Sequence, residues 1–177
     1  ELALGDTLGW VGSDMGKRET IMEAFSPEEQ VKMMIEVLGN RSPDDGVQIL
    51  YYAQKMPYIA PEGEFAPSRF RFDPLLAFLR KKFEGEMIML QPWQDGISRE
   101  NIETAIHAYL KTFATLGGKV EIDYIARYLS HGDPRIVEQA ASVLAHYHSP
   151  FDDDNEEEKK KLVSEKIFTY LEPLLKH

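Results

Sequence analysis

The chain contains no cysteine, which excludes disulfide bonds, zinc sites built on thiolates and cysteine nucleophiles. It also lacks long hydrophobic runs, since no stretch approaches the roughly 18 consecutive apolar residues that suggest a membrane-spanning helix. We therefore expect no membrane span. Neither absence assigns a cellular compartment or an oligomeric state.

Basic side chains are scarce. The chain has 20 Lys and Arg against 30 Asp and Glu, for a formal net charge of −10. Binding to a nucleic-acid backbone requires a local excess of basic residues, and the densest basic cluster here is only Arg80–Lys82. The charge therefore disfavours a nucleic-acid partner, and it permits a basic protein partner without requiring one. A length of 177 residues indicates one domain or a short repeat array.

The N-terminal segment differs from the rest of the chain. Gly5, Gly9, Gly12 and Gly16 interrupt any periodicity, so residues 1–20 are predicted to form an irregular or flexible arm. The stretch GSDMGKR places too few residues between its glycines for a phosphate-binding loop and has Arg where that loop has Ser or Thr. We expect a single all-helical domain over residues 21–177.

Helix signals recur from residue 26 onward. Ser26 and Glu29 have the spacing of a capping box, and Gly39 is a typical residue after a helix end. Later N-caps are predicted at Ser42, Asp73, Ser98 and Asp133. The later helices are predicted at 42–57, 73–85, 98–118, 119–131, 133–148 and 153–177.

Apolar periodicity predicts which face of each helix is buried. On the predicted helix at 133–148, the residues expected on the buried face are Val137, Ala140, Ala141, Leu144 and His148. On the C-terminal helix they are Val163, Ile167, Tyr170, Leu171 and Leu174. Apart from a short candidate strand at 87–90, no strand pattern is present. Short links make successive helices antiparallel neighbours, so the fold class is all-α, with antiparallel helix pairs stacked as a short alpha solenoid or an irregular helical bundle.

One stretch, DPRIVEQAASVL, resembles the second-helix signature of HEAT-type repeats. The residues that fill the positions of that signature are Asp133, Pro134, Ile136, Ala140, Ala141 and Leu144. The sequence departs from it at Val137, where the family has Arg. The resemblance covers residues 98–150 and implies a HEAT-like solenoid, whose extended concave surface suits protein or peptide partners.

The sequence offers few groups for chemistry. His146 and His148 lie two apart, so a helix would point them to different sides. The acidic run at 152–158 fits no register of a calcium-binding EF-hand loop. No serine lies in a glycine-flanked nucleophile elbow. We therefore assign no catalytic, cofactor-binding or metal-ligating residue and expect no cofactor.

Two irregular segments, 57–72 and 86–97, concentrate aromatic and methionine side chains, which are enriched at binding surfaces. The candidate partner-binding residues are Tyr58, Phe65, Phe70, Met87, Met89 and Trp93. The expected function is a non-catalytic protein–protein interaction or scaffold module with a protein or peptide partner. The alternative is a small-ligand-binding protein or an enzyme with an aromatic-lined pocket between helices. An enclosed pocket near His107 or His131 would favour the alternative, and a shallow apolar groove would favour the partner.

Overall fold

The computed structural model describes residues 25–41, 46–58, 69–87, 99–152 and 157–176. These residues form helices joined by turns, and none of them forms a strand, which confirms an all-α fold. The α-helices are α3 (Pro27–Gly39), α4 (Val47–Lys55), α5 (Asp73–Lys82), α6 (Arg99–Gly117), α7 (Ile122–Ala126), α8 (Pro134–Ala145) and α9 (Glu157–Leu171). None of the described helices combines the length and apolar content that a membrane crossing needs.

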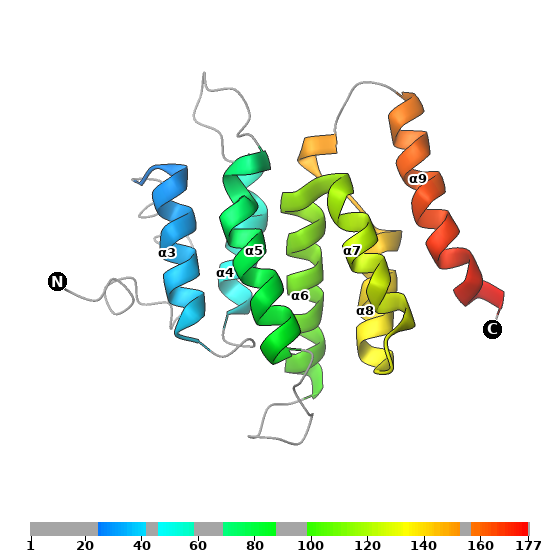
Figure 1. The fold of residues 1–177 in the computed structure, drawn as a ribbon, viewed down its shortest axis with the longest axis horizontal. Coiled ribbons are helices and arrows are strands. Elements are labelled where there is room, and N and C mark those ends of the chain that lie inside the picture. The colour runs from blue at the N-terminus through cyan, green and yellow to red at the C-terminus, as the bar shows by residue number, and fades with distance from the viewer. Residues whose placement is uncertain (1–24, 42–45, 59–68, 88–98, 153–156, 177) are drawn as a thin grey trace.

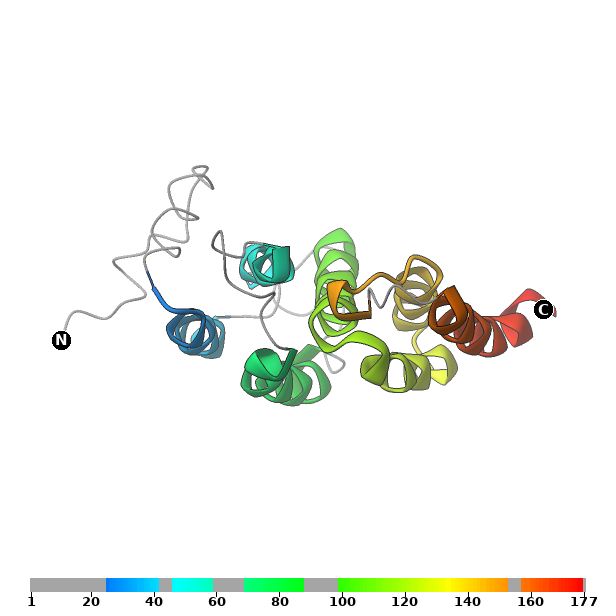
Figure 2. The same cartoon turned by 90° about the horizontal axis from the view of Figure 1, so that it is seen from above.

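The helices lie in two rows. Viewed from above, α3, α5 and α7 lie on one side and α4, α6 and α8 on the other, with α9 beyond α7 and α8 at the end (Figure 2). Successive helices in the side view alternate in direction, and α3 and α9 are at opposite ends of the molecule (Figure 1). The long helix α6 packs against α4 on one side and α8 on the other, and its Ile106, Tyr109 and Phe113 are buried.

Two predicted helix starts are confirmed. At α3 the Glu29 amide donates to Ser26 Oγ at 3.4 Å, and the Ser26 amide donates to Glu29 Oε2 at 2.8 Å, which completes the capping box. At α8 the Asp133 side chain accepts from the Arg135 amide, and Pro134 is the first helical residue. Each pair satisfies backbone donors that the first turn leaves without intrahelical partners.

The predicted cap at Asp73 is wrong. Asp73 is the first residue of α5, and the N-cap position belongs to Phe72, which makes no side-chain cap and is buried. Burial of the Phe72 ring in the core therefore sets the helix start, and Asp73 lies in the first turn, where the helix dipole favours a carboxylate. The other two predicted caps, Ser42 and Ser98, lie outside the described residues.

The predicted helix at 119–131 is present as an unbroken helical segment, but only its middle is α-helical. It consists of a 3₁₀ turn at Gly118–Glu121, the short helix α7 and a second 3₁₀ turn at Arg127–Ser130. Gly118 has a φ of 66°, a left-handed conformation that glycine adopts without strain and that redirects the chain after α6. The Glu121 side chain is then turned inward to pair with Arg80 of α5.

The buried faces of α8 and α9 differ in part from the prediction. On α8, Ile136, Ala140, Val143 and Leu144 are buried. Val137 and Ala141 are half-buried, so the face is rotated slightly. His148 is wrongly placed on this face: α8 ends at Ala145, and His148 is exposed beyond it.

The end of α8 is fixed by two capping contacts. The Lys111 ammonium donates to the carbonyl of His146 at 3.2 Å, and the ring Nδ1 of His146 lies 3.0 Å from the carbonyl of Ser142. On α9, Val163, Ile167, Tyr170 and Leu171 pack partly buried against the core, as predicted. Leu174 is wrongly included, because it lies past the end of α9 in a 3₁₀ turn and is 39% exposed.

Candidate functional site

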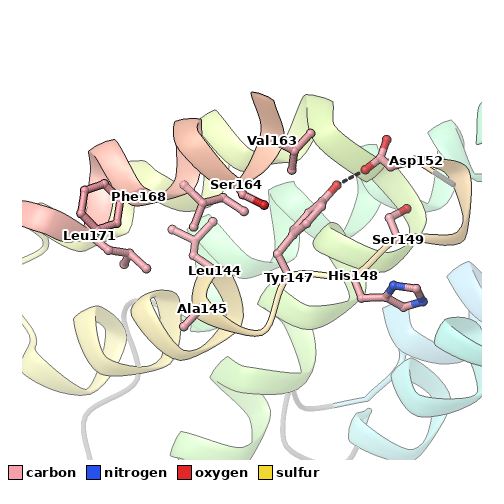
Figure 3. Close-up of a pocket in the computed structure, with 11 residues that line it drawn as sticks. Leu144, Ala145, Tyr147, His148, Ser149, Asp152, Val163, Ser164, Phe168 and Leu171 are labelled. Carbon is pink, nitrogen blue, oxygen red and sulfur yellow. Dashed lines mark hydrogen bonds between the residues drawn. The ribbon is translucent and has the colours of Figure 1, made fainter. Parts of the chain in front are cut away.

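An open groove runs between α9 and the C-terminal end of α8, continued by residues 147–152. Its volume is about 670 Å³. Most of its lining is apolar, and Figure 3 shows the two walls facing each other. The lining residues are Leu144, Ala145, Tyr147, His148, Ser149, Asp152, Val163, Ser164, Ile167, Phe168 and Leu171.

The α9 wall arises because this helix carries apolar residues on more than one side. Val163, Ile167 and Leu171 face the core. Phe168 lies one position beyond Ile167, so its ring lies at the flank of that stripe, where it is 58% exposed. A side chain this exposed leaves the groove open to solvent along that wall. Leu162, which is 63% exposed, adds a further uncovered apolar side chain on the same helix.

Polar contacts hold α9 to α7. Asp123 on α7 accepts from Lys166 Nζ at 2.8 Å and from the Tyr170 hydroxyl at 2.6 Å. These hydrogen bonds lower the pKa of the Asp123 carboxyl, and the neighbouring carboxylate raises the pKa of Tyr170. Both side chains of the ion pair are substantially exposed, so the contact positions α9 without contributing much stability.

The groove contains a Ser, a His and an Asp, but their geometry does not form a catalytic triad. Ser149 is buried, and its Oγ donates to the backbone carbonyl of Thr115 at 3.0 Å. Asp152 accepts a hydrogen bond from the Tyr147 hydroxyl, and burial together with this contact raises the pKa of Tyr147. The His148 ring is directed away from Phe168 and Leu171 (Figure 3). Serine and aspartate are thus committed to structural contacts, and no base is arranged to activate the serine.

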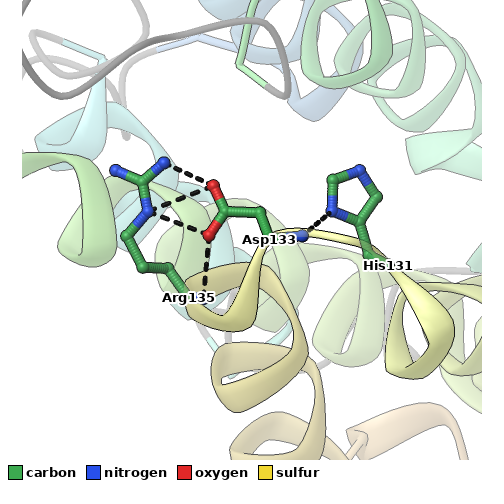
Figure 4. A network of polar contacts seen from close by, with 3 residues as sticks. All are labelled: His131, Asp133 and Arg135. Atoms are coloured by element: carbon green, nitrogen blue, oxygen red, sulfur yellow. Dashed lines mark hydrogen bonds and ion pairs between the residues drawn. The ribbon is translucent and has the colours of Figure 1, made fainter.

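The remaining histidines have structural partners. The Nδ1 atom of His107 lies 3.0 Å from Gln139 Oε1, which links α6 to α8. His131 Nδ1 accepts from the Asp133 amide at 3.0 Å, next to the paired carboxylate of Asp133 and guanidinium of Arg135 (Figure 4). This arrangement organises the turn into α8. Within the described residues, no three His, Asp or Glu side chains are grouped so as to hold a metal ion.

A second concentration of titratable groups lies between α5 and α7. Glu121 is only 2% exposed and pairs with Arg80, whose guanidinium lies 5.1 Å from the centre of the Tyr124 ring. The Tyr124 hydroxyl donates to Glu84 Oε1 at 3.1 Å and accepts from Tyr128 at 3.0 Å. Burial raises the pKa of both tyrosines. The cluster fills the space between the two helices, so its role is to fix their packing.

Of the six predicted partner-binding residues, only Tyr58 has a described side chain. It is 57% exposed and stacks on His148, with ring centroids 6.3 Å apart and 16° between the planes. Phe70 and Met87 lie in short helical turns whose backbone alone is described. The other three, Phe65, Met89 and Trp93, lie outside the described residues.

The groove walls were not predicted from the sequence. A usable signal was present in α9, because Leu162 and Phe168 do not belong to the apolar stripe that contains Val163 and Ile167. An amphipathic helix with apolar residues outside its buried face has a second surface to cover. Tyr58, one of the predicted partner-binding residues, stacks on His148, which lines the groove.

No protein-family model, no curated protein and no solved structure matches the chain.

Proposed function

We propose that the protein is a non-catalytic protein–protein interaction module built on stacked helix pairs, arranged as a short HEAT-like solenoid. The groove between α8 and α9 is its contact surface. The observation that carries this proposal is the open apolar groove, one wall of which includes Phe168, a residue that is 58% exposed. The two-row arrangement of α3 to α8 and the Asp133–Pro134 start of α8 support the solenoid part of the proposal.

Several features of the groove favour a macromolecular partner. Large exposed apolar side chains on a folded protein mark interaction surfaces when they gather around a concave site. Phe168 belongs to the groove, and the exposed ring of Tyr58 extends this surface through its stacking on His148. Aromatic side chains of this kind commonly act as anchors at protein interfaces.

The alternative, a small-ligand-binding protein, is favoured by one observation: a volume of about 670 Å³ lies in the range of small-molecule sites. Such sites bury most of the ligand surface, however, and the Phe168 wall is open. Ser149 is buried and its hydroxyl donates to the Thr115 carbonyl, so it does not orient a ligand in the groove.

The proposal is tested by comparing two variants that remove equally exposed apolar side chains. Phe168→Gln changes the groove, and Val120→Gln changes another apolar residue that is also 58% exposed but does not line the groove. Partners captured with the full chain from its native source are quantified for both variants. We expect at least one protein to be retained by the unmodified chain and by V120Q and lost with F168Q. Equal capture by both variants would reject the groove as the contact surface.

A further inference from the structure

We infer that the groove between α8 and α9 receives one amphipathic α-helix of a partner protein, lying antiparallel to α9 with Lys or Arg in its last turn. This inference rests on the proposed function and specifies the chemistry of the partner.

The packing of the second row indicates a helix as the occupant. The central helix α6 contacts α4 on one side and α8 on the other, and it also contacts α5 and α7. On its outer side, α8 contacts α9, and the groove lies between them. A helix seated in this groove would pack on α8 and α9 together. It would cover the C-terminal end of α8, which α6 and α7 contact from the other side.

The length of the groove fits the apolar stripe of such a helix. Its α9 wall runs from Val163 to Leu171, which corresponds to about 12 Å along the helix axis at 1.5 Å per residue. Apolar residues at positions i, i+3, i+4 and i+7 of a partner helix cover about 10.5 Å. This spacing is the usual pattern of anchors when a helix binds in a groove. A single stripe of two turns therefore fills the groove.

The charge of the groove and the directions of α8 and α9 indicate the orientation of the partner helix. Asp152 lies at the end where α9 begins, and among the described lining residues none is Lys or Arg. The whole chain carries a net charge of −10.

The helices α8 and α9 run in opposite directions (Figure 1). A partner helix that is antiparallel to α9 would therefore end at the end of the groove where Asp152 and Val163 lie (Figure 3). The last turn of a helix favours basic side chains through the helix dipole, and here it would also lie beside the Asp152 carboxylate.

The test uses the full chain and a display library of random peptides of about 14 residues, roughly four helical turns. Because every position is randomised, the library does not favour helical peptides over extended ones. We expect enriched peptides to carry apolar residues at i, i+3, i+4 and i+7 with Lys or Arg near the C-terminus. Their affinity should fall about tenfold or more for F168Q, stay unchanged for V120Q, and weaken as salt rises.

Four results would overturn the inference: no enrichment, enriched peptides without helical spacing, helical peptides whose affinity F168Q leaves unchanged, or a dimer of the chain itself that F168Q dissociates. Its failure is distinguishable from failure of the proposed function. If F168Q abolishes capture of a native protein while the enriched peptides show no helical spacing, the interaction module stands and the helix is rejected. If no native protein depends on Phe168, the proposed function itself fails.

Discussion

The ammonium of Lys166 lies 2.8 Å from Asp123 Oδ2, and this contact joins α9 to α7 across the end of the helical stack. Tyr170, one turn further along α9, donates to the other oxygen of the same carboxylate. Asp123 therefore ties α9 to α7, alongside the packing of Val163, Ile167, Tyr170 and Leu171 against the core. The groove is a product of tertiary placement, to which the Asp123 carboxylate contributes the polar contacts of one wall.

Replacing Lys166 by Gln should loosen α9 without unfolding the protein. The ion pair is exposed, so we expect a global stability change below about 1 kcal/mol. We expect faster amide hydrogen exchange in α9, while exchange in α6 stays unchanged. Lys161→Gln is the matched control, because Lys161 pairs only weakly with Glu165 of its own helix, at 3.9 Å. Equal exchange rates in the two variants would show that the contact of Lys166 with Asp123 does not position α9.

Neighbouring alanines on α8 should respond very differently to a charge. Ala140 is completely buried and Ala141 is half-buried. Ala140→Glu places an unpaired carboxylate in the core and should cost more than about 4 kcal/mol, whereas Ala141→Glu can direct its carboxylate toward solvent and should cost less than about 2 kcal/mol. Urea denaturation followed by circular dichroism measures both. The account of α8 packing is wrong if A141E is the less stable of the two.

Residue-level signals explain which parts of the fold the sequence predicts. The starts of α3 and α8 depend on residues within one helical turn, Ser26 with Glu29 and Asp133 with Arg135, so local chemistry specifies them. The end of α6 is also local, since the helix ends at Gly117 and the chain turns at Gly118, which has a positive φ. The inward turn of Glu121 is not local, because its partner Arg80 lies 41 residues earlier in the chain.

The candidate site was harder to predict for a similar reason. The helical period identifies the apolar residues of α9, but it does not say how far α9 stands from α8. That separation creates the groove, and it depends on the long-range contacts of Asp123. Tyr58 was identifiable as an exposed aromatic in an irregular segment, whereas its stacking on His148 requires the tertiary structure.

The pair of Arg80 and Glu121 should show energetic coupling. Arg80→Met removes the guanidinium from a buried carboxylate and should destabilise the protein by about 2–3 kcal/mol. Glu121→Gln removes the charge with little change in volume. The free energy of unfolding of the double variant should fall by at least about 1 kcal/mol less than the sum of the two single decreases, because neither charge is then left without its counterpart.

Arg127→Met is the control for this cycle. Arg127 also lies over the Tyr124 ring, at 5.8 Å, but it is exposed, and its replacement should cost less than about 0.5 kcal/mol. Strict additivity of the Arg80 and Glu121 substitutions would show that the pair is not coupled.

Asp133 should make stability depend on pH in the acidic range. Hydrogen bonds from Arg135 hold the pKa of Asp133 below its ordinary value of 3.8, so the ionised form is favoured in the folded state. The contribution of this group to stability is complete above about pH 5, where the carboxylate is ionised in both the folded and the unfolded state. It is lost as the pH falls below 3.8 and through the lowered pKa of the folded state.

Asp133→Asn isolates this contribution, since the amide keeps an acceptor for capping and removes the charge. The unmodified protein should be more stable than D133N by about 1 kcal/mol near pH 6, and the difference should shrink toward pH 3. Thermal or urea unfolding at several pH values measures the difference. A constant difference across this range would exclude the ionised carboxylate as its cause.

The central claim, that the groove between α8 and α9 is the partner-binding surface, is tested most directly by amide hydrogen exchange of the full chain with and without a captured partner. The account predicts slower exchange at residues 144–152 and 163–171, with α3 and α4 unchanged. Slower exchange confined to α3 and α4, with the groove unchanged, would contradict it.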